Sequence, residues 1–180
     1  MKVLLTGQVG LDKGEFLKEV QRIAEKKGRR ISFESIGSRM LQVYEGRHDD
    51  TTILNLPRGE LNMCRRHVWK EITREAQAQR AEDIFIVNSH AVFRWHHGLF
   101  PAIDLDLVWE LAPDVLVTLI DDVDKVVEGL EERGTGTFEM WELLAWREEE
   151  IWFTKFLRDG LSRLVKGKIE FFVLAKEHGP

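Results

Sequence analysis

The first fifteen residues, MKVLLTGQVGLDKGE, constrain the fold of this chain more than any other segment. The run Val3–Leu5 is short, apolar and prone to form a strand. It stops at Gly7, and a periodic, charged helical pattern begins near Asp12. The order of strand, glycine loop and helix, with the spacing from Gly7 to Lys13, fits the phosphate-binding pattern G-x-x-x-x-G-K-[ST]. In such a loop, backbone N–H groups and the helix start attract an anion, and the lysine reaches the outer phosphates.

Two positions of this loop depart from the pattern. Asp12 stands where a glycine is expected, and Gly14 replaces the serine or threonine whose hydroxyl ligates Mg²⁺. Asp12 and Glu15 also have the spacing of a helix capping box, so an alternative is that the protein's own side chains fill the anion site. We expect a nucleotide or another phosphate compound to bind at the loop residues Gly7, Gln8, Val9, Gly10, Leu11, Asp12, Lys13, Gly14 and Glu15.

Composition narrows the classes of protein and of partner. The 180 residues suffice for one domain with a sizeable core, and the single cysteine, Cys64, excludes an internal disulfide framework and suits a reducing cytosol. No apolar run approaches the ~20 residues of a membrane helix. A net charge of -5 argues against a nucleic-acid-coating protein. We therefore expect a cytoplasmic protein whose partners are a nucleotide and a second copy or a fused C-terminal domain, and neither a membrane nor a nucleic acid.

Strand-like and helix-like segments alternate along the whole chain. Short apolar runs, typical of strands, cover residues 30–34, 83–87, 114–120 and 169–174. Amphipathic periodicity predicts helices over residues 13–27, 35–44, 59–80, 105–111, 122–132 and 139–165. This alternation predicts an α/β fold of three layers, P-loop NTPase-like, with a parallel sheet of about five strands flanked by helices. Ligands then bind at the carboxyl ends of the strands, where the loops at Gly7, Ser35, Asn88 and Asp121 are expected to meet.

The same pattern predicts the domain organisation. We expect a single domain over residues 1–175 with a helical insertion near 35–80. Residues 176–180 resemble a linker to a further domain.

Two longer segments resemble nucleoside monophosphate kinases, most closely the archaeal type of adenylate kinase. FESIGSRMLQVYEG, residues Phe33–Gly46, resembles the helix around the monophosphate site of that family. NSHAVFRWHHGLFPAIDLDLVWELAPDVLVTLI, residues Asn88–Ile120, is similar to the family segment that begins Asp-Thr-His, passes a Gly-Tyr-Leu-Pro element and ends in the fourth strand. The resemblance implies ATP or another nucleotide as cofactor, accompanied by Mg²⁺, and phosphotransfer to a nucleotide or slow NTP hydrolysis. It also implies that the domain over residues 1–175 is kinase-like and that a lid-like segment lies near 128–150.

The resemblance also implies roles for single residues. The residues implied for catalysis are Lys13, Arg133 and Arg147. Those implied for substrate binding are Arg39, Asn88, His90 and Arg94. Arg65, like Arg39, stands where an arginine that binds the monophosphate would sit. Asn88 replaces the acidic residue that helps to hold metal-bound water, and Arg133 is the one clear cation of the lid. No metal site of the protein's own is predicted, and the alternative function is a catalytically degenerate kinase fold that serves as a regulatory or interaction module.

Histidines and tryptophans allow further interpretations. His90, His96 and His97 lie close enough in sequence for a metal site, although surface histidines are the simpler interpretation. Trp95 beside Arg94 is the best candidate for stacking on a base, which leaves an RNA-associated factor as a third, weaker hypothesis. Four other tryptophans lie on apolar helix faces, and we expect them in the core: Trp69, Trp109, Trp141 and Trp152.

Overall fold

A five-stranded parallel sheet forms the centre of the molecule. The computed structural model describes residues 1–44, 56–95, 98–134, 138–164 and 168–177. The sheet has the order β2-β3-β1-β6-β7. Its strands are β1 (Lys2–Thr6), β2 (Ile31–Ser35), β3 (Ile84–Asn88), β6 (Val115–Ile120) and β7 (Glu170–Ala175). The predicted parallel α/β architecture is confirmed, and β1 lies in the middle, paired with β3 and β6.

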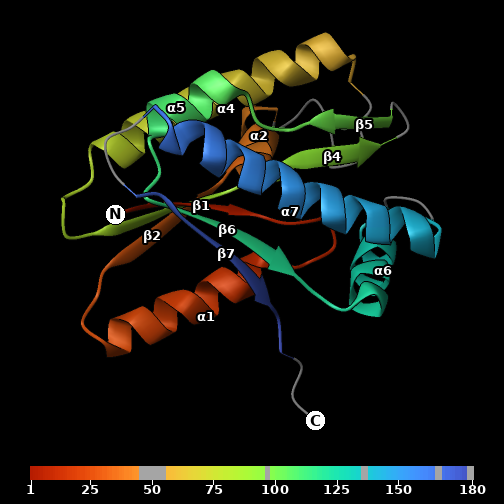
Figure 1. Ribbon diagram of the computed structural model, residues 1–180, viewed down its shortest axis with the longest axis horizontal. Coiled ribbons are helices and arrows are strands. Elements are labelled where there is room, and N and C mark those ends of the chain that lie inside the picture. Colours follow the sequence, from red (N-terminus) through yellow and green to blue (C-terminus); the bar gives the residue numbers. More distant parts are fainter. Residues whose placement is uncertain (45–55, 96–97, 135–137, 165–167, 178–180) are drawn as a thin grey trace.

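Helices cover both faces of the sheet and complete three layers (Figure 1). One face carries α1 (Lys13–Lys26) and α6 (Val123–Glu132), and the other carries α2 (Ile36–Val43), α4 (Arg58–Gln77), α5 (Leu105–Leu111) and α7 (Met140–Ser162). Because successive side chains of a strand point to opposite faces, β1 contributes side chains to the hydrophobic cores on both faces of the sheet. Val3 and Leu5 pack in the cluster of Leu17 on α1, whereas Leu4 packs in the cluster of Ile72 on α4.

A small hairpin lies in the segment that the sequence pattern leaves as a loop. It consists of β4 (Val92–Trp95) and β5 (Gly98–Pro101), which pair antiparallel. Each strand has only four residues, so its periodicity is too short to predict a strand. Phe93 and Phe100 are opposite one another in the hairpin and both are buried. The hairpin continues the chain directly from the carboxyl end of β3, and therefore shapes the edge at which the predicted loops meet.

Several expectations fall on residues outside the described part of the chain. They are those for the histidines at 96–97, for the Trp95 side chain and for the end of the linker at 178–180. The insertion near 35–80 corresponds in its described parts to α2 and α4, which pack on each other. The lid-like segment near 128–150 corresponds to the end of α6 and the first half of α7. The domain division itself stays a prediction.

The prediction for the tryptophans is correct for one of four. Trp69 is fully buried, but Trp109, Trp141 and Trp152 are 43%, 64% and 67% exposed. Helical spacing identifies an apolar stripe but does not tell which stripe meets the sheet. On α7 the residue that meets the core is Trp146, which is 1% exposed.

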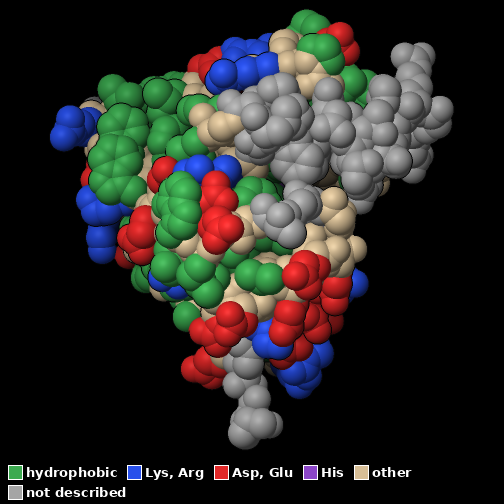
Figure 2. Space-filling model, turned by 90° about the vertical axis from the view of Figure 1, so that its right-hand side faces the viewer, with side chains coloured by type: hydrophobic (Ala, Val, Ile, Leu, Met, Phe, Trp, Pro, Cys, Tyr) green, Lys and Arg blue, Asp and Glu red, His purple; other side chains and the backbone are tan. Residues whose placement is uncertain are grey.

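Figure 2 looks onto the side that holds α6 and the start of α7, where hydrophobic side chains gather at the surface. In the described part of the chain, every helix is too short or too polar to cross a membrane.

Candidate functional site

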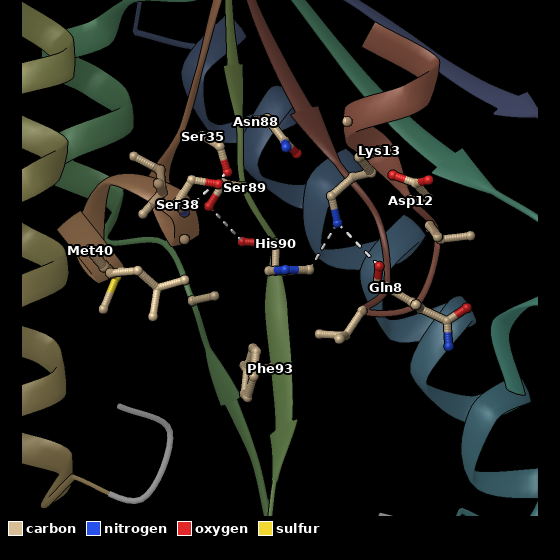
Figure 3. A pocket seen from close by; sticks show the side chains of 18 of the residues that line it. Gln8, Asp12, Lys13, Ser35, Ser38, Met40, Asn88, Ser89, His90 and Phe93 are labelled. Atoms are coloured by element: carbon tan, nitrogen blue, oxygen red, sulfur yellow. Dashed lines mark hydrogen bonds between the residues drawn. The ribbon is translucent and has the colours of Figure 1, made fainter. Parts of the chain in front are cut away.

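A cavity of about 380 Å³ opens at the carboxyl ends of β1, β2 and β3. One end is lined by the loop residues 8–14 between β1 and α1. The other end is lined by residues of α2, α4 and the β4–β5 hairpin. Figure 3 shows the two ends, with Lys13 and Gln8 on one side, Met40 and Ser38 on the other, and His90 between them. The cavity therefore joins a polar loop to a second compartment.

The glycines of the loop are required by close packing. Gly7 has a φ of +147°, and a Cβ there would lie 2.7 Å from the carbonyl oxygen of Leu119. Gly10 has a φ of +94°, and its Cβ would lie 2.7 Å from the carbonyl oxygen of Val126 on α6. A Cβ on Gly129, also on α6, would lie 2.1 Å from the carbonyl oxygen of Gly10. The loop is thus clamped between the sheet and α6, which leaves no room for a side chain at these three positions.

Asp12 takes the place of a glycine in conformation as well as in sequence. Its φ of 38° and ψ of 57° are left-handed, a region that aspartate tolerates better than most residues. The Asp12 carboxylate accepts a hydrogen bond of 3.2 Å from the backbone N–H of Glu15 and so caps α1. The Asp12 half of the capping box expected from the sequence is present, yet residues 8–14 still line a cavity.

Lys13 points back into its own loop. Its ammonium group donates to the carbonyl oxygens of Gly7, at 2.7 Å, and of Gln8, at 3.1 Å. Burial lowers the pKa of Lys13 from its ordinary value of 10.5 to about 7, while the charge of Glu150 raises it and that of Arg133 lowers it further. An ammonium group this poorly hydrated gains more from an incoming anion than an exposed one does.

His90 shares an acceptor with Lys13. Its Nδ1 lies 2.6 Å from the carbonyl oxygen of Gly7, and 3.1 Å from the lysine nitrogen. A carbonyl oxygen only accepts, so Nδ1 carries the hydrogen and Nε2 keeps its lone pair. Burial, and secondarily the charge of Lys13, lowers the pKa of His90 well below its ordinary 6.5. The imidazole is therefore neutral at physiological pH.

A buried carboxylate lies behind the loop, and the sequence reasoning missed it. Glu150 of α7 is 1% exposed. One of its oxygens accepts from the N–H of Gly7, at 2.7 Å, and of Ala91, at 2.8 Å; the other accepts from the N–H of Val92, at 2.8 Å. Burial raises the pKa of Glu150, against the effect of Lys13 and of these three donors. In the sequence it ends a run of three glutamates, which is typical of a solvated helix face.

Within the residues that the structure describes, the far end of the cavity is mostly apolar and has one cation. Arg65 of α4 lines it, donates to the side chain of Asn62 at 3.1 Å and lies over the ring of Phe100. Burial lowers the pKa of Arg65, and its neighbour Asp104 opposes this effect. Among the described residues no carboxylate forms an ion pair with Arg65, and the neighbouring Asp104 pairs with Arg66. The apolar side chains of this end include Phe33, Ile36, Met40, Leu41, Leu61 and Phe93.

The structure brings some of the predicted site residues together and separates others. Asn88, His90 and Arg133 line the cavity with residues 8–14. Gly7 and Glu15 belong to the loop but are not among the lining residues. Three predicted arginines are also absent from the cavity lining: Arg39, Arg94 and Arg147. Arg39 pairs with Glu34 and Glu75, and Arg94 pairs with Glu149. Arg147 lies on α7.

The side chains at the loop do not fit a Mg²⁺ ion held by the protein. Gly14 has no hydroxyl, and Asn88 offers a buried amide oxygen that has no hydrogen-bond partner in the described part of the chain. Asp121, at the end of β6, lies 3.6 Å from the ammonium group of Lys176. The described residues contain no group of three histidines, cysteines or acids placed to hold a metal. Any Mg²⁺ would have to be held mainly by the phosphates of a ligand.

Comparison with known proteins agrees with this architecture. The profile of the AAA domain family matches residues 6–139. Kti12 of Chaetomium thermophilum, solved in complex with ADP-AlF3, is similar in fold at 14% identity with a TM-score of 0.51, over 97% of this chain and 89% of that one. An uncharacterized protein from Eubacterium ventriosum shows a weaker likeness, at 9% identity and a TM-score of 0.39, over 97% and 89% of the two chains.

Proposed function

The chain belongs to the AAA domain family as a P-loop nucleotide-binding domain, and from this membership we propose that residues 7–15 bind the phosphates of ATP or ADP. The observation that carries the proposal is the cavity that the loop forms around the buried ammonium group of Lys13. Kti12, which shares the fold, was crystallised with ADP-AlF3. That complex supports a nucleotide as the ligand here.

Lys13 is the proposed phosphate-binding cation. In the proposed complex, the ammonium group donates to phosphate oxygens in place of the carbonyl oxygens of Gly7 and Gln8. Charged acceptors thus replace neutral ones, which strengthens the hydrogen bonds. Arg133 at the end of α6 lines the same cavity and adds a second positive charge. Both charges favour the tri- or diphosphate over the nucleoside, because the nucleoside has no negative charge for them to attract.

The far end is the proposed acceptor compartment of an adenylate-kinase-like transfer. Its apolar side chains suit the flat face of a base, and Arg65 suits a phosphate group of the acceptor. His90 and Asn88 lie between the compartments, where the phosphoryl group would pass. The proposed reaction is ATP-dependent phosphotransfer to a nucleotide, or slow hydrolysis where no acceptor is bound.

Calorimetric titration tests binding most simply. ADP, ATP and AMP are titrated into the wild-type protein and into Lys13→Met, each with and without Mg²⁺. We expect ADP and ATP to bind the wild type below millimolar concentration and the variant far more weakly. Absence of heat from all three nucleotides at millimolar concentration would eliminate the proposal.

A catalytically degenerate module is the second candidate. Asp12 in its capping role, Gly14 without a hydroxyl and Asn88 without a charge all favour it. Restoring the pattern in one protein, with Asp12→Gly, Gly14→Thr and Asn88→Asp, would then raise nucleotide turnover from a low baseline. A coupled assay of ADP production decides between the two candidates, since high turnover by the unmodified protein contradicts the second.

A further inference from the structure

We propose that Glu150 is a positioning residue for nucleotide binding, whose carboxylate fixes the start of the phosphate loop and the segment after His90 in one arrangement. The proposal rests on the proposed nucleotide function and assigns a role to a side chain outside the loop. Glu150 does not line the cavity, so it acts through the backbone that it holds.

The peptide groups around Gly7 connect the carboxylate to the cation. The Gly7 N–H donates to Glu150, while the Gly7 carbonyl oxygen accepts from Lys13 and His90. The backbone N–H of Gly7 is thus bonded to Glu150 behind the loop, and its carbonyl oxygen to Lys13 and His90 at the cavity. The N–H and the carbonyl oxygen belong to the two peptide planes that meet at the Cα of Gly7, so these hydrogen bonds fix one plane each and together define the backbone conformation of the residue.

The same carboxylate holds the other wall of the site. Ala91 and Val92 directly follow His90, and their N–H groups both donate to Glu150. The imidazole is consequently placed by the same side chain that places the loop. Two further bonds join these segments to α7: the Gln8 amide donates to the carbonyl oxygen of Leu143, and the Trp146 indole donates to that of Val92.

The charge of Glu150 matters as well as its shape. A neutral side chain at this position would leave the ammonium group of Lys13 facing Arg133 without the buried negative charge that now raises its pKa. The groups that face Lys13 are Glu150 behind the loop, His90 beside it, Arg133 from α6 and the cap at Asp12. Glu150 is the fully buried anion of this set.

Glu150→Gln removes the charge with little change in volume. A glutamine has one accepting oxygen, so its NH₂ group must face at least one of the three N–H donors. We expect amide hydrogen exchange to accelerate at one or more of Gly7, Ala91 and Val92, and ADP affinity to fall about tenfold. Glu148→Gln, an identical change on the exposed face of the same helix, is the matched control and should alter neither quantity.

The pH dependence separates positioning from general stability. ADP affinity of the wild type should decline as the pH rises through about 7, because Lys13 loses its proton there. In Glu150→Gln the decline should begin at lower pH, since the buried negative charge is gone. A variant that merely folds less well would keep the wild-type midpoint.

Wild-type exchange rates keep the proposal testable should Glu150→Gln fail to fold. The amides of Gly7, Ala91 and Val92 must then be protected like strand amides, and exchange at open-loop rates would overturn the proposal. Equal ADP affinity and pH midpoint in the wild type and in Glu150→Gln would also overturn it. If the wild type binds no nucleotide, the proposed function fails, and the exchange data alone decide whether Glu150 positions the loop.

Discussion

The two ends of the cavity are built by different means. At the loop end, three glycines have no room for a side chain, and Lys13, His90 and Glu150 all hydrogen-bond to the backbone of Gly7. At the far end, apolar side chains of α2 and α4 surround one arginine that forms no ion pair among the described residues. The difference indicates that the loop is organised before any ligand arrives, whereas the far end depends on its ligand to complete the charge balance.

A pair of helical glycines tests this contrast with the largest expected effect. A Cβ on Gly129 would lie 2.1 Å from the Gly10 carbonyl oxygen, whereas nothing lies within 4 Å of a Cβ on Gly37 of α2. We expect Gly129→Ala to lower the free energy of unfolding by about 3 kcal/mol, as overpacking does. Gly37→Ala, the matched control, should raise it by up to about 1 kcal/mol through helix propensity. Denaturant titration of both variants measures this, and equal losses would refute the contrast.

The next largest effect is expected at Lys13. Lys13→Met removes the cation and should weaken ADP binding about a hundredfold, or about 2.7 kcal/mol. The pKa of Lys13 is about 7 in the folded state and 10.5 in the unfolded state, so between these values the unfolded chain binds more protons. Wild-type stability should therefore rise relative to Lys13→Met from about pH 7 to about pH 10.5. A difference that stays flat over this window would contradict the burial of a titrating amine.

Two neighbouring arginines probe the far end. Arg65 lines the cavity, whereas Arg66 points to Asp104 and Asp106 at the surface. We expect Arg65→Met to weaken AMP binding about tenfold and Arg66→Met to change it less than about twofold. Titration of both variants with AMP measures the effect. Equal losses would mean that the arginine in the cavity has no special role.

The smallest effect is expected at Asp12. Asp12→Gly relieves the strain of a left-handed backbone conformation at this position but removes the side chain that caps α1 through the Glu15 N–H. Because these two effects oppose one another, the free energy of unfolding should change by less than about 1 kcal/mol. The same change removes a negative charge from the phosphate site and should raise ADP affinity about threefold. Thermal unfolding and ADP titration check the two parts separately. A fall in affinity would show that the Asp12 cap helps the site.

The loop could be predicted from sequence because its information is local. Glycines at fixed positions, a strand before them and a helix after them identify the loop from Gly7 to Lys13 without knowledge of distant residues. The alternation of apolar runs and amphipathic helices predicted the parallel sheet for the same reason. The family assignment agrees with both, while the finer likeness to adenylate kinase stays a proposal.

The features that sequence reasoning missed are determined by tertiary packing. Glu150 looks like one of several surface glutamates until the fold places it 2.7 Å from the Gly7 N–H, 143 positions away. Arg39 and Arg94 have the charge that a phosphate site needs, yet Glu75 and Glu149 bind them elsewhere. Trp141 and Trp152 lie on an apolar stripe of α7 that the sheet does not cover. Such outcomes depend on which faces meet, and a single sequence does not specify this.

An NMR titration of the backbone amides with ADP tests the central claim, that a preformed phosphate loop encloses Lys13, most directly. The account predicts saturable shifts concentrated in residues 8–14 and at His90, with the same amides unmoved by adenosine. Amides that stay unchanged up to millimolar ADP, or that shift equally with adenosine, would contradict it.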